Sequence, residues 1–201
     1  NNQLWNPLRS NLSRKTASTQ SIKPLVLLVN FDNLPSGMDD TTYTKGNFTD
    51  LIFTKNLNPT SAGFPSNYEM SVWDYFDEIS NQKFDINGDK GSVVDWTKAN
   101  HDYSFYVDGV QGTGRGNGAD GSDNYAQSAS ALVVEIAMKI NKGGFDFSVF
   151  NNGKGTIDVV CLIIEGWMDG DNDRFWPHMS YIPNTIIPTE ASNSDGYFEL
   201  D

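Results

Sequence analysis

Carboxylate side chains at alternate positions make residues 169–173 the segment of this sequence best suited to bind a cation. The carboxylates belong to Asp169, Asp171 and Asp173, with a glycine and an asparagine between them. Hard cations such as Ca²⁺ take several oxygen ligands from loops of this kind. The segment is not an EF-hand, because the required glycine and bidentate glutamate do not follow. It therefore predicts either a calcium site at these three residues or a solvated acidic turn.

A catalytic zinc site is incomplete within the 201 residues. Two histidines occur, His101 and His178, and no His-Glu-x-x-His sequence places two imidazoles and a glutamate base on one helix. A catalytic zinc usually takes three protein ligands, so the fold would have to bring these histidines and a carboxylate together. A Ser-His-Asp triad has no Gly-x-Ser-x-Gly elbow to indicate it. A glycosidase carboxylate pair leaves no sequence trace among so many aspartates, so an unrelated hydrolase with a scattered active site stays open.

The glycine-rich stretch and the lone cysteine are interpreted as structural features and not as sites of chemistry. Glycines alternate from Gly112 to Gly118, but Arg115 is the basic residue among them and acidic residues follow. We interpret this stretch as a surface loop, since a phosphate-binding loop needs a preceding strand and usually a lysine. The lone cysteine, Cys161, lies in an apolar run and is predicted to be a buried small side chain, not a nucleophile.

The charge balance restricts the partners. Lys and Arg number 14 and Asp and Glu 26, so the net charge is −12. Nucleic-acid backbones and anionic membranes would repel such a chain. The longest apolar run, residues 159–164, is too short to span a bilayer. The abundance of Asp, Asn, Gly, Ser and Thr is typical of a loop-rich secreted or extracellular protein, with any signal peptide already removed.

The elements that position these residues follow from the apolar pattern. Residues 1–21 read as a polar N-terminal arm, residues 24–31 as a buried strand and residues 48–57 as a short helix. A long helix is expected from a cap at Asp123 to about Asn141, followed by a central strand over residues 156–164. This order predicts an α/β sandwich around a mixed sheet.

Residues 71–79 predict the clearest helix. Ser71 caps it and Asp74 completes a capping box. Four apolar residues share a stripe that should face the core: Val72, Tyr75, Phe76 and Ile79. Strands at 84–86 and 93–96 are expected to form a hairpin across residues 87–91, where Asp85, Asn87 and Asp89 make a weaker cation candidate.

Four segments carry more specific patterns in a fixed order. They are residues 24–32 (Pro-Leu-Val-Leu-Leu-Val-Asn-Phe-Asp), residues 71–76 (Ser-Val-Trp-Asp-Tyr-Phe) followed by residues 80–86, residues 145–148 (Phe-Asp-Phe-Ser) followed by residues 157–160, and residues 175–178 (Phe-Trp-Pro-His). In this order they resemble peptidase family M6, the immune-inhibitor-A-like secreted zinc metallopeptidases.

The resemblance implies an α/β, zincin-like metallopeptidase fold, of which this chain is the N-terminal subdomain, with a mixed twisted sheet and two main helices. Residues 22–201 would then be the N-terminal portion of an M6-like domain that lacks the zinc-binding helix. That helix is expected after a segment like residues 186–190, so the zinc ligands and the general base would lie outside this chain. No catalytic residue is assigned, and the family's Asp-rich loop is replaced by residues 151–155, which lack its acidic ligands.

The resemblance also implies a protein or peptide substrate that adds a strand to a sheet edge. The candidate edge is the segment of residues 179–187, with Ser180, Tyr181 and Ile182 as the substrate-binding residues. An ordinary surface loop is the alternative, since Pro183 and Pro188 occur there. An open sheet edge would also allow a homodimer.

Two main functions stay open. The first is the N-terminal portion of a secreted zinc metalloendopeptidase, inactive alone, with zinc in the complete enzyme and calcium as a further cation. The second is a non-catalytic, peptidase-like module that binds peptide or carbohydrate at the cell surface. Its exposed aromatic candidates are Trp5, Trp167, Trp176 and Tyr181. The encoding gene beyond Asp201 distinguishes the two, because the enzyme requires a His-Glu-x-x-His sequence downstream.

Overall fold

A computed structural model describes most of the chain between residues 20 and 166. The described residues are 20–35, 43–58, 70–107, 111–115, 126–151, 153, 155–166, 174–175 and 179, together with the backbone of 185–188 and 197–200. Within these residues, no helix is both long and apolar enough to cross a lipid bilayer.

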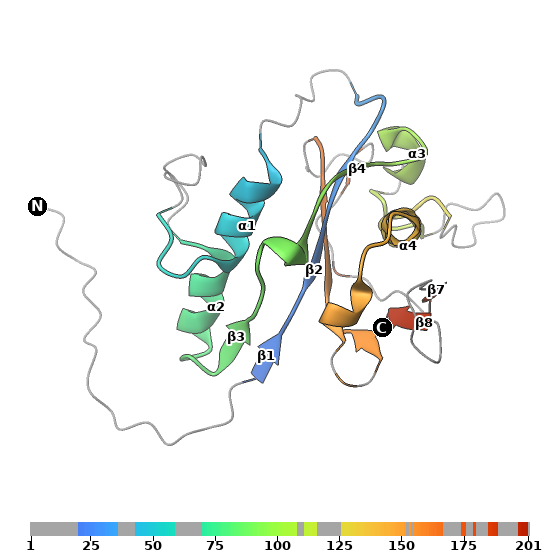
Figure 1. The fold of residues 1–201 in the computed structure, drawn as a ribbon. Helices are drawn as coiled ribbons and strands as arrows, with labels where there is room; N and C mark the ends of the chain where they lie inside the picture. The colour runs from blue at the N-terminus through green and yellow to red at the C-terminus, as the bar shows by residue number, and fades with distance from the viewer. Residues whose placement is uncertain are drawn as a thin grey trace, which may run out of the picture.

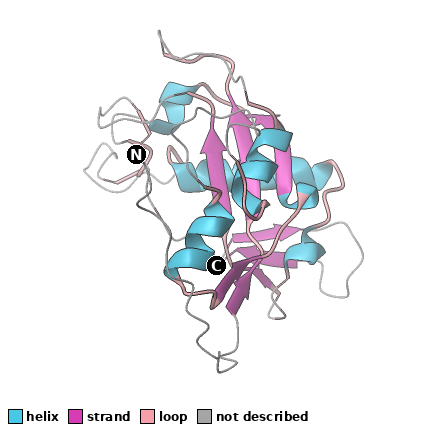
Figure 2. Cartoon of the chain, turned by 90° about the vertical axis from the view of Figure 1, so that its left-hand side faces the viewer, coloured by secondary structure: helices cyan, strands magenta, loops and turns pink. Residues whose placement is uncertain are grey.

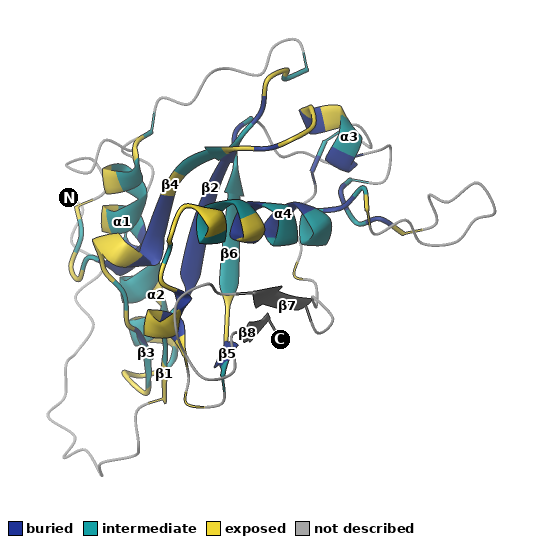
Figure 3. Ribbon diagram, turned by 45° about the vertical axis from the view of Figure 1, so that its right-hand side comes forward, coloured by how far each residue is buried: buried dark blue, intermediate teal, exposed yellow. Residues whose placement is uncertain are grey.

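A parallel sheet forms the centre of the molecule. Strand β2 (Leu25–Asn30) lies between β4 (Val93–Lys98) and β6 (Val160–Ile164), and both neighbours run parallel to it. The apolar run of β2 is buried from Leu25 to Val29 because helices cover both faces of the sheet. Figure 3 shows the three strands side by side with α4 (Ala129–Lys142) crossing in front.

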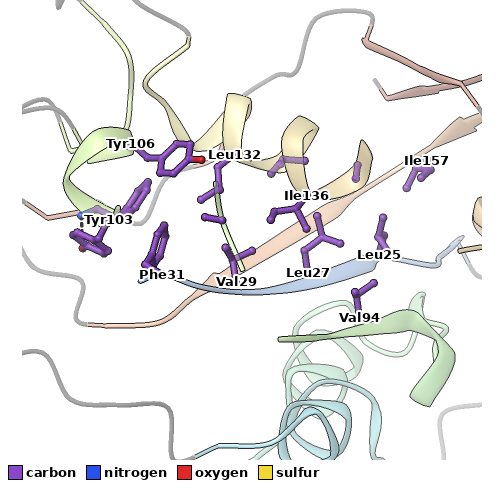
Figure 4. Packing of buried hydrophobic residues seen from close by; sticks show 14 of the residues in the cluster. Leu25, Leu27, Val29, Phe31, Val94, Tyr103, Tyr106, Leu132, Ile136 and Ile157 are labelled. Carbon is purple, nitrogen blue, oxygen red and sulfur yellow. Dashed lines mark hydrogen bonds between the residues drawn. The ribbon is translucent and has the colours of Figure 1, made fainter. Parts of the chain in front are cut away.

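Alternate residues of β2 supply two cores. Leu25, Leu27 and Val29 pack in one cluster with Leu132 and Ile136 of α4, as Figure 4 shows. The intervening residues, Val26 and Leu28, pack with Ile52 and Phe53 of α1 (Lys45–Phe53), and α2 (Val72–Ile79) joins this second cluster. Figures 1 and 2 show α1 and α2 together on the face opposite α4. The predicted α/β sandwich is therefore confirmed. The expected short helix is present as α1, but it begins three residues and ends four residues earlier than the predicted range of 48–57.

Strands β3 and β4 do not form the expected hairpin. β3 (Phe84–Ile86) pairs in parallel with β1 (Gln20–Ile22), and β4 pairs in parallel with β2, so β3 and β4 follow one another along the same side of β1 and β2. Between them the chain forms a 3₁₀ turn, η1 (Lys90–Ser92). Asp89 accepts a hydrogen bond from the Gly91 N–H at 2.7 Å, and the Ser92 hydroxyl oxygen accepts one from the Asp89 N–H at 3.2 Å. This capped turn returns the chain to its original direction.

The predicted strand over residues 156–164 is divided. β5 (Thr156–Ile157) pairs with β8 (Tyr197–Leu200), which also pairs with β7 (Thr185–Pro188), whereas β6 pairs with β2. The central position therefore belongs to β2. The apolar run did not reveal the break at Asp158 and Val159, because its two halves pair with different sheets.

The capping box of α2 is confirmed and has a second role. The Ser71 hydroxyl accepts a hydrogen bond from the Asp74 N–H at 2.9 Å, and the Asp74 carboxylate accepts from the Ser71 N–H at 3.4 Å. The same carboxylate accepts hydrogen bonds from the N–H groups of Asn56 at 2.7 Å and Leu57 at 3.1 Å. Asp74 thus joins the start of α2 to the chain that leaves α1.

The core-facing stripe predicted for α2 is only partly correct. Tyr75 is 51% exposed and Ile79 is 59% exposed, while Trp73 and Phe76 pack against the core. The Trp73 indole N–H donates a 2.7 Å hydrogen bond to the carboxylate of Asp85 in β3. This bond turns the Trp73 side of the helix toward β3 and leaves Tyr75 and Ile79 facing outward.

Helix α4 begins later than predicted. Its N-cap is Ser128, whose hydroxyl accepts a hydrogen bond from the Ala131 N–H at 3.2 Å. Ser128 has an extended backbone, with φ −147° and ψ 164°, so the helix cannot run continuously from Asp123, which lies outside the described residues. Gly143 ends the helix as expected.

Candidate functional site at the carboxyl edge of the parallel sheet

The connections that leave the carboxyl ends of the neighbouring strands β2 and β4 diverge to opposite faces of the sheet. The connection from β2 to β4 passes through α1 and α2 on one face, and the connection from β4 to β6 passes through α3 (Tyr103–Val107) and α4 on the other. Crevices at such switch points of parallel sheets are common ligand sites. This edge is therefore the first place to look for functional side chains.

Glu165 occupies the gap between the carboxyl ends of β2 and β6, at the same edge of the sheet. Its N–H continues the ladder by donating to the Val29 carbonyl at 2.8 Å. Its side-chain oxygen Oε2 then accepts a hydrogen bond from the Phe31 N–H at 3.0 Å, where the next ladder bond would have used a backbone carbonyl. Glu165 is only 5% exposed. A buried carboxylate therefore ends the sheet at this point.

Asn30 adds a second oxygen at the same edge. Val29 is in register with Ile164, so Asn30 and Glu165 are the next residues along the two strands. The Asn30 Oδ1 atom is buried and has no hydrogen-bond partner in the described part of the chain. A buried acceptor without a donor typically costs about 1–3 kcal/mol.

Exposed polar groups surround this edge. Lys98 at the end of β4 forms an ion pair with Asp32, and both side chains are more than half exposed. The Asn33 amide donates a 2.9 Å hydrogen bond to Asp102. These surface pairs contribute little to stability but keep the rim polar.

Phe175 holds the chain that follows β6 against α3. Its N–H donates a 3.0 Å hydrogen bond to the Tyr103 hydroxyl, and its ring contacts the Tyr103 ring edge-on with centroids 5.2 Å apart. Gly112 lies beneath this ring with φ +77°, and a Cβ atom there would approach Phe175 Cδ1 to 2.3 Å. Gly112 therefore serves packing. Gly112 and Gly114 are buried, so this part of the stretch is not the expected surface loop, and Gly116 and Gly118 lie outside the described residues.

Tyr106 and Glu135 form a second polar contact near the end of β4. Glu135 accepts hydrogen bonds from the Tyr106 hydroxyl at 2.5 Å and from the Asn100 N–H at 2.7 Å. Burial, followed by the hydrogen bond to Glu135, raises the pKa of Tyr106 far above its ordinary value. Tyr106 thus keeps its proton at neutral pH and acts as a structural donor. His101 is exposed, and its ring stacks on Phe105 with centroids 4.0 Å apart.

The described residues do not fit a catalytic zinc ion. They contain no group of three or more His, Cys, Asp or Glu side chains placed to hold a metal. In the weaker candidate cluster, Asp85 accepts the Trp73 indole hydrogen bond and Asp89 caps η1. Burial raises the pKa of the Cys161 thiol, which agrees with a packing role for this residue.

The predicted calcium and substrate-binding residues come after Glu165 in the chain. The metal candidates Asp169, Asp171 and Asp173 begin three residues after Gly166, and they lie outside the described residues. The substrate-binding candidates also lie outside them: Ser180, Tyr181 and Ile182. Both sets, and with them the calcium site, stay predictions. The sequence analysis did not predict a role for Glu165 or Asn30. Each is a polar residue that directly follows an apolar run, and this pattern could have indicated them.

Two variants should separate the contribution that the Glu165 hydrogen bond makes to stability from the contribution of its charge. Glu165→Gln keeps an acceptor at the same length, whereas Glu165→Met has a similar shape and no acceptor. The Met variant should unfold about 1–3 kcal/mol more easily than the Gln variant, because the Phe31 N–H is left without a partner. Urea unfolding measures this difference, and faster hydrogen exchange at the Phe31 amide should accompany it. Equal stability of the two variants would show that the bond contributes nothing.

Comparison with known families identifies the chain. The family model described as immune inhibitor A peptidase M6, catalytic domain, matches residues 12–165. This match takes in most of the chain, so the protein belongs to peptidase family M6, a family of zinc metallopeptidases. No curated protein matches the chain. The family resemblance is confirmed, with three of the four sequence segments inside the match and residues 175–178 beyond it. The mixed α/β architecture is consistent with a fragment of a metallopeptidase catalytic domain. The match ends at Glu165, the residue that closes the sheet.

Proposed function

We propose that these residues form the zinc-free part of the catalytic domain of a secreted M6 endopeptidase. The observation that supports this most is the family match, which takes in the parallel sheet and the helices on both of its faces. The 201 residues contain no His-Glu-x-x-His sequence. The role proposed for this part is therefore to build the sheet and one wall of the substrate cleft, and it should not hydrolyse peptides by itself.

The substrate is proposed to be an extended peptide bound near residues 180–182. The extended, antiparallel pairing of β7 with β8, which begins three residues after Ile182, supports the proposal, since strand addition requires an extended backbone. Main-chain hydrogen bonds to such a strand would fix the peptide's position, and side-chain pockets would select its sequence.

The alternative is a non-catalytic, peptidase-like module that binds peptide or carbohydrate. Both proposals share the same fold, so they differ in what the gene encodes after residue 201. A downstream His-Glu-x-x-His sequence supports the enzyme, and a stop codon directly after residue 201 supports the module.

The experiment is a peptidase assay on the product of the continued gene. That product should cleave a quenched fluorescent peptide, and a zinc chelator or a Glu→Gln change in its His-Glu-x-x-His sequence should abolish the cleavage. The 201-residue chain, assayed beside it with added zinc, should show no cleavage. Zinc-dependent cleavage by the shorter chain would contradict the proposal.

A further inference from the structure

Helix α2 presents an apolar face that the described structure leaves uncovered. Tyr75 and Ile79 lie one turn apart on this face, and the exposed Glu78 lies beside them. Residues four apart on a helix are neighbours, so the two apolar side chains form one patch. The other large apolar side chains exposed among the described residues are far apart in the sequence: Met138, Val149, Val159 and Met179.

The charges on α2 itself have one sign, whereas Lys55 Nζ lies 4.3 Å from the centroid of the Trp73 ring and Lys83 follows the helix. α2 carries Asp74, Asp77 and Glu78 and has no basic residue. Asp74 is occupied by its cap hydrogen bonds, whereas Asp77 and Glu78 form no ion pair within the described part of the chain. On α4, in contrast, the exposed Met138 is followed by Lys139. The α2 patch therefore favours a partner that is both apolar and basic.

The N-terminal segment has this composition. In a chain of net charge −12, residues 1–19 contain three basic residues and no acidic residue. The basic residues are Arg9, Arg14 and Lys15, and the large apolar residues are Leu4, Trp5, Leu8 and Leu12. We propose that residues 8–15 dock on the exposed face of α2, with Leu8 and Leu12 against Tyr75 and Ile79 and the basic side chains near Asp77 and Glu78.

The segment joins the described part of the chain at Gln20, close enough to α2 for this contact. The Gln20 N–H donates a 2.9 Å hydrogen bond to the Lys83 carbonyl, and Lys83 is four residues beyond Ile79. The eight residues from Gln20 back to Leu12 can extend to about 26 Å. The eight-residue helix α2 is only about 12 Å long. The family match also begins at residue 12, so part of the segment falls within the matched domain.

Limited trypsin digestion tests the proposal, because Arg14 and Lys15 are themselves cleavage sites. Docking should protect these two peptide bonds from trypsin. The cleavage rate should then be proportional to the fraction of molecules in which the segment is transiently released. Ile79→Lys removes an apolar contact and adds a repulsive charge, so cleavage after Arg14 and Lys15 should become about tenfold faster. Met138→Lys makes the same change at an exposed position of α4 and should leave the rate unchanged.

The same digestion also tests whether the acidic side chains of α2 attract the segment, and whether the segment docks on its own chain. The double variant Asp77→Asn, Glu78→Gln should accelerate cleavage about threefold if the carboxylates attract the segment. Equal rates in the wild type, Ile79→Lys and Met138→Lys proteins would overturn the proposal. Protection that disappears on dilution would overturn it as well, because the segment would then dock on a second copy. The outcome is independent of the peptidase assay, since no catalytic activity is measured.

Discussion

Replacing Leu27 with alanine should lower the free energy of unfolding by about 3–5 kcal/mol. Leu27 has no exposed surface and lies in the middle of β2, in register with Val94 on one side and Leu162 on the other. Its side chain points toward Leu132 and Ile136 of α4 (Figure 4). Rigid neighbours on β4, β6 and α4 prevent the cavity from collapsing, so the loss should be near the upper end for a leucine.

Urea unfolding followed by tryptophan fluorescence measures this change. Leu27→Met keeps the side-chain volume and should cost less than about 1.5 kcal/mol. Val149→Ala, at a half-exposed position of η2 (Phe147–Phe150), should change stability by less than about 0.5 kcal/mol. A Leu27→Ala protein as stable as the Val149→Ala protein would show that β2 is not the centre of the folded unit.

Gly112→Ala should lower the free energy of unfolding by about 2–4 kcal/mol, of which left-handed backbone strain contributes about 1–2 kcal/mol. The remainder comes from the Phe175 ring, which lies where the new Cβ atom would be. Phe175 would have to leave its contacts with Tyr103, so the chain after β6 would detach from α3.

Gly153→Ala is the matched control for this variant. Gly153 has φ +86°, and a Cβ atom there meets nothing within 4 Å in the described structure, so only the backbone strain of about 1–2 kcal/mol is expected. The Phe175 amide should exchange faster in the Gly112→Ala protein and remain unchanged in the Gly153→Ala protein. Equal losses in the two proteins would exclude a packing role for Gly112.

Local chemistry explains which elements were predictable from the sequence. The capping box at Ser71 and Asp74 needs only residues three apart, and the strand at β2 needs only its own apolar run. The hairpin between β3 and β4 was wrong because pairing with β1 and β2 is a long-range choice that turn residues do not determine. The break at Asp158 was missed for the same reason.

The candidate site was harder to predict from the sequence than the helices and strands were. Glu165 and Phe31 are 134 residues apart, and no local pattern relates a carboxylate at one strand end to an N–H at another. The exposure of Ile79 depends on a hydrogen bond between Trp73 and Asp85 that helical periodicity does not contain. The family resemblance was recoverable from the sequence because it uses the order of short segments along the chain.

Zinc content is the most direct measurement of the central claim that these residues are the part of an M6 catalytic domain without the metal site. Both the 201-residue chain and the product of the continued gene would be loaded with zinc, dialysed and measured by plasma mass spectrometry. We predict stoichiometric zinc in the longer product and none retained by the 201-residue chain. Stoichiometric zinc retained by the 201-residue chain, or a longer product that holds none, would contradict the account.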